Sequence, residues 1–336
     1  MPDIPLILIA VVGIALLFDF TNGAHDSANA IATIVSTKVL SPLAAVCMAG
    51  ALNLLGAFLG TAVAHTMGSG IVRPEMVTGS QTLVLAALLG AICWNLFTWY
   101  LGLPSSSSHA LVGGLVGAAV ACGGWGAPNY HSIVEKILLP LVLSPLAGFV
   151  SGYLLMVILS WLVRTSTPRR VNFLFKKLQI LSSAFMATGH GLNDAQKTMG
   201  IISLALFIFH EIPEMTVPFW VKISCAMAMG LGTATGGWKI VKTMGHKIFK
   251  LEPIHGFAAE TSAALVICAA SALGAPISTT HTISTTVIGV GASKRLSAVR
   301  WGIAGKLVVA WVLTIPASAL VGALCYWVLE LFGMAA

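Results

Sequence analysis

Long apolar segments separated by short polar ones make up most of this chain. A transmembrane helix needs about 20 consecutive apolar residues, and most of the segments reach that length. Only 9% of the 336 residues are charged, against about 25% in soluble domains. Continuous apolar runs, in place of alternation, favour helices over a lipid-exposed barrel. The sequence therefore predicts an all-α polytopic membrane protein, with apolar segments at about 3–34, 41–65, 80–102, 109–122, 133–163, 178–209, 218–241, 256–274, 282–292 and 300–332.

The charged residues and cysteines limit the partners that this chain could have. The formal net charge is +7, which in a soluble protein would suggest nucleic acid. Here the basic residues cluster in short connections, around 164–177, 242–250 and 294–300, as is typical of cytoplasmic loops. The six cysteines form no C-x-x-C pair, so neither a disulfide framework nor a zinc site is indicated. We expect membrane lipid around the chain and no nucleic-acid partner.

Two apolar segments, 109–122 and 282–292, are too short to cross a bilayer. At 1.5 Å per residue, a helix of that length reaches only about halfway across a core of about 30 Å. Each follows a hydroxyl-rich stretch, LPSSSSH before the first and APISTTH before the second. We therefore predict two re-entrant helical hairpins, at about 78–122 and about 256–292, with the hydroxyl-rich stretches at their tips.

The basic clusters predict how these hairpins are oriented. The second hairpin has basic clusters on both sides, so the positive-inside tendency places its open end in the cytoplasm. The first is flanked by 66–77 and 123–132, where the only Lys or Arg is Arg73, and should open to the outside. Each half then has three crossings, one of them broken, and one re-entrant hairpin. Both termini would lie outside the cytoplasm.

An odd number of crossings gives the two halves opposite orientations. This is an inverted-topology repeat, the usual architecture of secondary transporters. We predict a first repeat at 1–164, a basic cytoplasmic linker at 165–177, and a second repeat at 178–336.

Matching motifs support this duplication. NGAHDSANAIAT (22–33) parallels HGLNDAQKTMGI (190–201), so that Asp26 matches Asp194 at an offset of 168 residues. The two tip histidines match in the same order, at an offset of 172. Because the matched residues are polar, we expect the repeat to build a site; a purely structural duplication is the alternative.

Asp26 and Asp194 each lie in the middle of an unusually long apolar segment. An aspartate at the centre of a membrane helix costs roughly 2.5 to 3.5 kcal/mol, so packing alone does not explain two of them. Asparagines accompany them, at Asn22, Asn29 and Asn193. Neighbouring glycines predict that both helices are broken at this point, at Gly23 and at Gly189 and Gly191. Polar contacts that hold a helix bundle together are the alternative.

The hairpin tips predict an anion site. A tip places the start of its second arm near the membrane centre, and helix N-termini bind anions through free N–H groups and the helix dipole. Pro104 and Pro276 would end the first arms. The hydroxyls of Ser105–Ser108 and Ser278–Thr280 could donate to the anion, and capping of their own helices is the alternative for each of them.

Bare carboxylates would repel an anion, so a cation has to bind between them. Na⁺ suits carboxylates, amides and freed carbonyls; protons on carboxylates and imidazoles, such as those of His25 and His190, are the alternative. Lys197, one turn past Asp194, could neutralise that aspartate or contact the anion. We expect ion coupling at Asn22, His25, Asp26, Asn193, Asp194 and Glu260, with Na⁺ ligands, where Na⁺ binds, at Asn22, Asp26, Asn193 and Asp194.

The motifs NGAHDSANAIAT and GHGLNDAQKTMG, with PSSSSH and PISTTH, resemble the two signatures and two hairpin tips of the PiT family of inorganic phosphate transporters. The resemblance covers essentially the whole chain. It implies a secondary active transporter that imports inorganic phosphate with H⁺ or Na⁺ by alternating access, with no catalytic residue and no cofactor besides the coupling cation. By motif position it implies that phosphate is bound by Asp26, Asn29, Ser106, Ser107, Ser108, Asp194, Lys197, Ser278, Thr279 and Thr280.

The resemblance also implies a multi-pass protein of the cell inner (plasma) membrane, and leaves a homodimer open. One position departs from the family pattern: the first signature commonly reads Gly-Ala-Asn-Asp, whereas here it reads Gly23-Ala24-His25-Asp26. A histidine replaces an amide that could ligate Na⁺, which favours protons at the first site.

Three other functions stay open on the sequence. A symporter of another tetrahedral oxyanion, such as sulfate, is the nearest. A channel and an intramembrane hydrolase are more remote. The hydrolase is disfavoured because the Ser/His stretches carry no G-x-S-x-G elbow, and because duplicated Ser/His stretches and aspartates suit a pseudo-symmetric binding site better than a single nucleophile.

Overall fold

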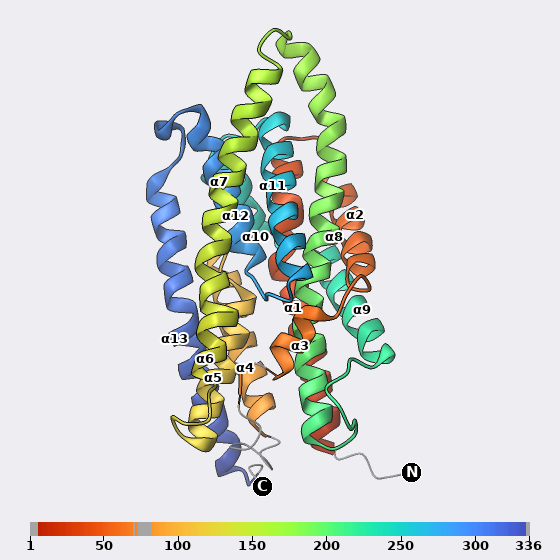
Figure 1. The fold of residues 1–336 in the computed structure, drawn as a ribbon, viewed down its shortest axis with the longest axis vertical. Coiled ribbons are helices and arrows are strands. Elements are labelled where there is room, and N and C mark those ends of the chain that lie inside the picture. The colour runs from red at the N-terminus through yellow and green to blue at the C-terminus, as the bar shows by residue number, and fades with distance from the viewer. Residues whose placement is uncertain (1–5, 70, 73–81, 334–336) are drawn as a thin grey trace.

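The computed structural model describes residues 6–69, 71–72 and 82–333, and helices build the fold of this part of the chain (Figure 1). Arg73 and the expected start of the first hairpin, near 78, lie outside the described residues. In chain order the elements are α1 (Leu6–Ser36), α2 (Pro42–Gly56), α3 (Ala62–Ser69), α4 (Thr82–Leu101), α5 (Ser107–Gly123), α6 (Tyr130–Ile133), the π-helical turn η2 (Val134–Leu138), α7 (Leu139–Leu162), α8 (Pro168–Ile208), α9 (Phe219–Thr235), α10 (Trp238–Lys242), the π-helical turn η3 (Thr243–Lys247), α11 (Pro253–Ala272), α12 (Thr279–Lys294), the 3₁₀ turn η4 (Leu296–Ala298) and α13 (Trp301–Leu331).

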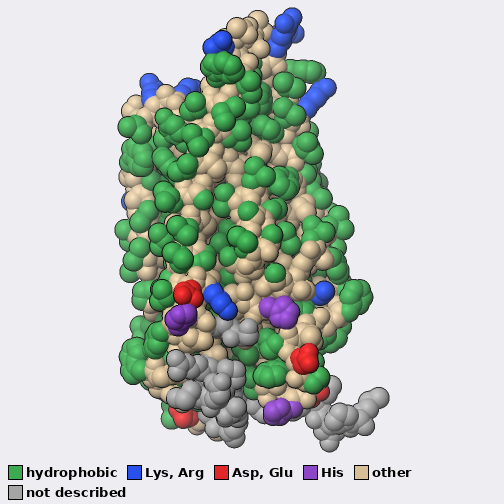
Figure 2. Space-filling model, in the orientation of Figure 1, with side chains coloured by type: hydrophobic (Ala, Val, Ile, Leu, Met, Phe, Trp, Pro, Cys, Tyr) green, Lys and Arg blue, Asp and Glu red, His purple; other side chains and the backbone are tan. Residues whose placement is uncertain are grey.

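The outer surface is apolar, as the sequence predicts for a membrane protein. Large side chains on α7 and α13 point outward, among them Leu143, Leu154 and Leu320, and hydrophobic side chains cover the middle of the face in Figure 2. A bilayer would cover such a surface. Within the described residues, five helical stretches are long and apolar enough to cross a membrane: Leu6–Ser36, Thr82–Leu101, Tyr130–Leu162, Pro253–Ala272 and Trp301–Leu331.

The two ends of the molecule differ in charge. One end, where α7 meets α8, carries Arg164, Arg169 and Arg170, and we call it the basic end (Figures 1 and 2). The other end, where α1 begins and α13 finishes, is the terminal end (Figure 1). The expected linker at 165–177 is largely helical, because α8 begins at Pro168 and continues for 41 residues. Only residues 163–167 connect the two helices.

Two pairs of packed helices lie toward these opposite ends, α4 with α5 toward the terminal end and α11 with α12 toward the basic end (Figure 1). The first arms stop earlier than expected, at Leu101 and Ala272. Gly102 and Gly274 then take positive φ angles of 66° and 69°, a conformation that favours glycine and commonly ends helices. The prolines that were expected to end the arms lie two residues further on, inside the connections.

The prediction of breaks at the two aspartates is wrong. α1 and α8 run continuously through Asp26 and Asp194, and their glycines serve close packing instead. A Cβ on Gly23 would overlap the Met229 carbonyl oxygen of α9, and one on Gly191 would overlap the Asn53 carbonyl oxygen of α2. The interruptions occur in those partner helices, at 57–61 between α2 and α3 and at 236–237 between α9 and α10.

The apolar core has two parts, one around each hairpin. The first includes Leu88 of α4 and Leu115 of α5, and the second includes Ile267 of α11 and Ile288 of α12. α1 contributes to both, through its beginning and its last turns. The buried polar residues of α1 lie between these two apolar parts, so the fold places a polar layer where the hairpin tips meet.

Candidate functional site

The tips of the two hairpins meet inside the molecule. The rings of His109 and His281, one from each tip, lie 4.7 Å apart between centroids, and Ser108 Oγ lies 3.5 Å from the Ile277 carbonyl oxygen. The N-termini of α5 and α12 therefore point into one region. Such N-termini present free N–H groups and a positive dipole end.

Each tip begins its second arm with the same cap. Ser106 Oγ accepts a hydrogen bond from the His109 backbone N–H at 3.2 Å, and Ser278 Oγ accepts one from the His281 backbone N–H, also at 3.2 Å. For these two serines the structure shows the capping role that the sequence left open. Of the hydroxyls that follow the caps, that of Ser108 contacts Lys197 and the second tip, and those of Thr279 and Thr280 contact the two aspartates.

Asp194 lies in a closed network of partners. Lys197 forms an ion pair with its Oδ1, and Thr279 donates to its Oδ2 at 2.9 Å. His190 Nε2 lies 3.1 Å from the same Oδ2 without hydrogen-bond geometry, while His190 Nδ1 donates to Asn53 Oδ1 at 2.7 Å. All of these side chains are buried. The aspartate charge is therefore neutralised by a neighbour on its own helix.

The Lys197 ammonium group donates its hydrogen bonds to protein oxygens. Besides Asp194, its Nζ donates to Ser108 Oγ at 2.5 Å and to the Ile277 carbonyl oxygen at 2.8 Å. Ser108 belongs to the first tip and Ile277 to the second. Lys197 thus links α8 to both hairpins.

The partners of Asp26 among the described residues are an imidazole and a hydroxyl, whereas Asp194 has an ammonium group. His25 Nδ1 donates to its Oδ1 at 2.7 Å, and Thr280 donates to the same atom at 3.2 Å. Asn29, one turn on, donates to Thr279 Oγ1 at 3.1 Å and to Thr280 Oγ1 at 2.9 Å. The second tip therefore contacts both aspartates, through two consecutive threonines.

Three groups of this site could hold a cation together. Ligand atoms of Asp26, His190 and Asp194 all lie within 4.8 Å of one another. Two carboxylates this close repel each other unless a positive charge lies between them. Their oxygens and an imidazole nitrogen suit a proton or a hard cation.

Four predicted substrate or coupling residues have a side-chain oxygen without a hydrogen-bond partner in the described part of the chain. These buried atoms are Asn22 Oδ1, Asn29 Oδ1, Asn193 Oδ1 and Ser107 Oγ. Buried polar atoms normally have partners, so these oxygens are candidates to bind a ligand. Ser107 is the first residue of α5, where an anion would meet the helix N-terminus.

Two predicted coupling residues have partners outside this site. Asn193 donates to Ser271 Oγ at 2.8 Å, on the first arm of the second hairpin. Glu260 accepts hydrogen bonds from a separate buried cluster toward the basic end, made of Thr33, Ser182 at 2.5 Å and Gln179 at 3.2 Å. Glu260 is therefore fully satisfied by protein donors.

Sequence reasoning missed three buried residues around the site. Asp19 accepts from Thr198 at 2.9 Å, Asn53 contacts His190, and Thr98 Oγ1 lies 3.3 Å from His25 Nε2. Asp19 carried a signal that was overlooked: it precedes Asp26 by seven residues, which places both on one helix face. The other two lie on segments whose contacts depend on the tertiary fold.

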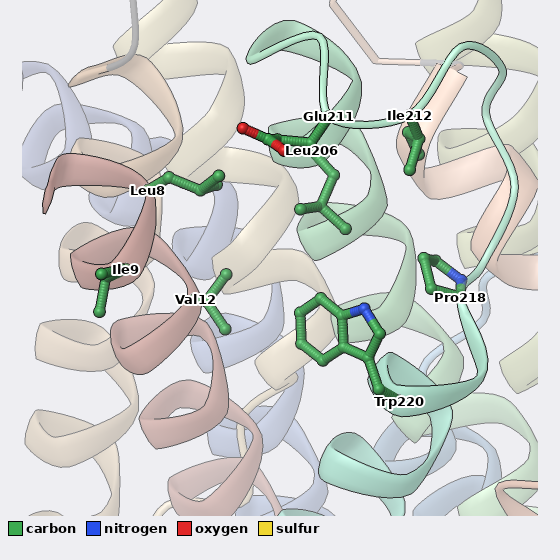
Figure 3. Close-up of a pocket in the computed structure, with 8 residues that line it drawn as sticks. All are labelled: Leu8, Ile9, Val12, Leu206, Glu211, Ile212, Pro218 and Trp220. Atoms are coloured by element: carbon green, nitrogen blue, oxygen red, sulfur yellow. The ribbon is translucent and has the colours of Figure 1, made fainter. Parts of the chain in front are cut away.

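Neither of two pockets at the ends of the molecule contains the site. One, of about 670 Å³, lies at the basic end and is lined by Thr37, Lys38 and Lys176, among others. The second, of about 410 Å³, lies at the terminal end between α1, α8 and α9 (Figure 3). Figure 3 shows mostly apolar side chains around it, with Glu211 and Trp220. Asp26 and Asp194 lie between these ends and are 2% and 0% exposed.

Comparison with known proteins identifies the family. The phosphate transporter family (PHO4) matches the chain twice, over residues 22–171 and 164–322. The chain belongs to this family. Its members are transporters and not enzymes, so the predicted absence of catalysis agrees with the family. The double match supports the internal repeat, and the prediction of an all-helical multi-span membrane protein is confirmed.

Relatives at high identity strengthen the assignment. The chain is 52% identical over 327 residues to a protein of Rhizobium meliloti (strain 1021) named probable low-affinity inorganic phosphate transporter, with 97% of each covered. A protein of the same name in Bacillus subtilis (strain 168) is 47% identical over 331 residues, covering 98% of this chain and 99% of that protein. A solved structure of a protein named the sodium-dependent phosphate transporter matches with a TM-score of 0.89 at 27% identity, covering 97% of this chain and 100% of that one. The resemblance to PiT phosphate transporters is confirmed.

Proposed function

We propose that this family member imports inorganic phosphate by secondary active transport coupled to a cation. The observation that carries the proposal is the meeting of two helix N-termini, one from each hairpin, beside two buried aspartates. Helix N-termini bind oxyanions, and carboxylates bind the cations that screen them. The names of the relatives support phosphate as the anion.

Phosphate would lie between the hairpin tips. The free hydroxyl of Ser107 and the first N–H groups of α5 would contact it from one side, and the start of α12 from the other. Asn29 would fix the second tip through its hydrogen bonds to both threonines. The proposed substrate site comprises Asp26, Asn29, Ser106, Ser107, Ser108, Asp194, Lys197, Ser278, Thr279 and Thr280.

The coupling cation would bind beside Asp26, within reach of His190 and Asp194. The imidazole of His25 on Asp26 favours a proton there, whereas the relative of solved structure is named as sodium-dependent. We therefore propose H⁺ or Na⁺ as the coupling cation. The wider set of coupling residues is Asn22, His25, Asp26, Asn193, Asp194 and Glu260.

The proposed topology has three crossings and one re-entrant hairpin in each half, with the halves at 1–164 and 178–336 inserted in opposite orientations. The broken crossings are α2 with α3 and α9 with α10. The protein lies in the inner (plasma) membrane with its basic end on the cytoplasmic side, so both termini lie outside the cytoplasm. The buried site corresponds to an occluded state, and rocking of the halves would open it to each side in turn.

Phosphate uptake into proteoliposomes tests the proposal, with Na⁺ and H⁺ gradients imposed separately. We expect labelled phosphate to accumulate under at least one inward gradient and to saturate with concentration. Phosphate uptake that does not depend on either gradient would reject coupled transport. A phosphate flux that does not saturate with concentration would indicate a channel. Excess unlabelled sulfate should leave the uptake unchanged; strong competition would instead support a general oxyanion carrier.

A further inference from the structure

The two signatures differ in formal charge, with histidine counted as neutral, at one matching position. Each has a residue three places after its aspartate, and the 168-residue offset pairs Asn29 with Lys197. The first half therefore carries a neutral amide where the second half carries an ammonium group. The rest of the repeat makes this difference informative, since the aspartates and both tip caps are duplicated.

The two side chains also make matching contacts. Lys197 donates to Ser108 of the first tip at 2.5 Å, and Asn29 donates to Thr280 of the second tip at 2.9 Å. Ser108 and Thr280 are themselves paired by the 172-residue offset that relates the tips. Lys197 thus occupies in its half the place that Asn29 occupies in the other half.

The partners of Lys197 form the ligand set of a small hard cation. They are a carboxylate of Asp194, the hydroxyl of Ser108 and the main-chain carbonyl of Ile277. Hard cations take carboxylate and carbonyl oxygens as ligands, and transporters coordinate Na⁺ with main-chain carbonyls. Because the ammonium has three protons and three acceptors, a phosphate would have to displace one of these partners to bind Lys197 directly. The side chain is also buried, at 2% exposure.

The matching place in the first half holds no such charge. Asn29 Oδ1 is buried and has no hydrogen-bond partner among the described residues. Together with the carboxylate of Asp26, one turn away, it leaves oxygen ligands available for an exchangeable cation. The two halves therefore offer one site with a built-in positive charge and one site without.

We propose that the Lys197 ammonium is a tethered cation that permanently fills the second of two pseudo-symmetric cation sites. The inference rests on the proposed cation-coupled transport and specifies how it is coupled. The exchangeable cation binds only on the Asp26 side, while the charge at Asp194 stays with the protein throughout the cycle. One fewer mobile cation then accompanies each phosphate than in a carrier with two open sites.

Lys197→Asn tests this by copying Asn29 into the second half, and Lys197→Met is the matched control that removes the charge without supplying an oxygen ligand. The midpoint of thermal unfolding is measured on purified protein in NaCl and in choline chloride of equal ionic strength. Both variants should be less stable than the parent in choline, because each leaves the Asp194 charge unpaired. Na⁺ should raise the midpoint of Lys197→Asn by about 5 °C more than it raises that of the parent, as expected for a newly bound ligand.

Na⁺ should raise the unfolding midpoint of Lys197→Met by no more than it raises that of the parent. An equal Na⁺ response in Lys197→Asn, Lys197→Met and the parent would overturn the proposal. If folded Lys197→Asn protein can be purified only in NaCl and not in choline chloride, the proposal is supported. If it can be purified in neither salt, while the double variant Asp194→Asn/Lys197→Asn, which lacks both charges, folds, then Na⁺ cannot replace the ammonium group and the proposal fails.

Uptake by the parent protein separates this inference from the proposed function. If the parent does not accumulate phosphate under either gradient, the proposed function fails whatever the unfolding data show. If the parent transports and Lys197→Asn gains about tenfold stimulation by Na⁺ over choline, the tethered-cation role is supported. Transport by Lys197→Asn with the ion dependence of the parent would reject it.

Discussion

The two helices that carry the signature motifs, α1 and α8, have similar backbone geometry at the site and differ in charge. In α8, Asp194 is paired with Lys197, while in α1 Asp26 contacts the imidazole of His25 and a threonine hydroxyl. Both helices stay continuous through their aspartate, and both aspartates meet the second hairpin tip. The difference teaches that backbone geometry and charge can diverge separately after a duplication.

The backbone features of the hairpin tips are similar in the two halves. A left-handed glycine ends each first arm, and a serine caps each second arm with the same 3.2 Å hydrogen bond. These features fix where the helix N-termini point, which an anion site in either half requires. The charged residues decide which cation accompanies the anion, and there the two halves are unequal.

The largest expected contrast is between Asp194→Asn and Asp26→Asn. Both should abolish coupled uptake while the protein still reaches the membrane, because Asp26→Asn removes a ligand of the exchangeable cation and Asp194→Asn removes the partner of the Lys197 ammonium group. Asp194→Asn should also cost about 3 to 5 kcal/mol of stability, since it leaves the buried Lys197 charge unpaired. Asp26→Asn should cost clearly less. Uptake and unfolding measurements on both variants check this, and an equal loss of stability would contradict the unequal roles of the two aspartates.

Glycine substitutions test the close packing of the signature helices. Gly191→Ala should lose about 1 to 3 kcal/mol of stability, because the added methyl group overlaps the Asn53 carbonyl oxygen. Gly23→Ala should lose stability in the same way against Met229. Gly13→Ala is the control on α1, where no described residue of another helix lies within 4 Å of the added Cβ. If all three variants unfold at the same temperature, the glycines do not serve close packing.

Ser107→Ala and Thr279→Ala compare the two tips at matching positions. Ser107 Oγ has no protein partner among the described residues, so its loss should raise the half-saturation concentration for phosphate about tenfold and leave stability unchanged. Thr279 Oγ1 joins Asn29 to Asp194, so its loss should affect both affinity and stability. Uptake kinetics and unfolding midpoints distinguish them. An unchanged half-saturation concentration in Ser107→Ala would remove that hydroxyl from phosphate binding.

The smallest expected effect concerns the caps. Ser106→Ala and Ser278→Ala should each cost about 1 kcal/mol of stability, because each removes the acceptor for one helix N–H group. Glycine at either position should cost only a few tenths. The two halves should respond equally, in contrast to the aspartates. Unfolding midpoints that differ strongly between the two alanine variants would show that the tips are not equivalent.

The sequence predicted the hairpins and the aspartates because both depend on local features. Short apolar segments cannot cross a bilayer, and an aspartate in a long apolar run is costly wherever the helix packs. Helix breaks were misplaced because a glycine that bends a helix and a glycine that admits a neighbour look the same in a sequence. Gly23 and Gly191 are of the second kind.

Two further differences have physical reasons of their own. The basic residues suggested a linker at 165–177, but a helix can continue past the membrane into water, as α8 does from Pro168 at the basic end. The partners of His190 and Glu260 could not be predicted, since Asn53, Thr33 and Gln179 come from other segments. Asp19 could have been found, because its spacing from Asp26 follows the helix repeat.

The number of phosphates bound per chain tests the central claim most directly, that both halves build one site. Equilibrium dialysis of the purified protein with labelled phosphate should give one phosphate per chain at saturation. Ser107→Ala in one tip and Thr279→Ala in the other should each weaken that single binding event. Two phosphates per chain, with each variant weakening only one of them, would contradict the account.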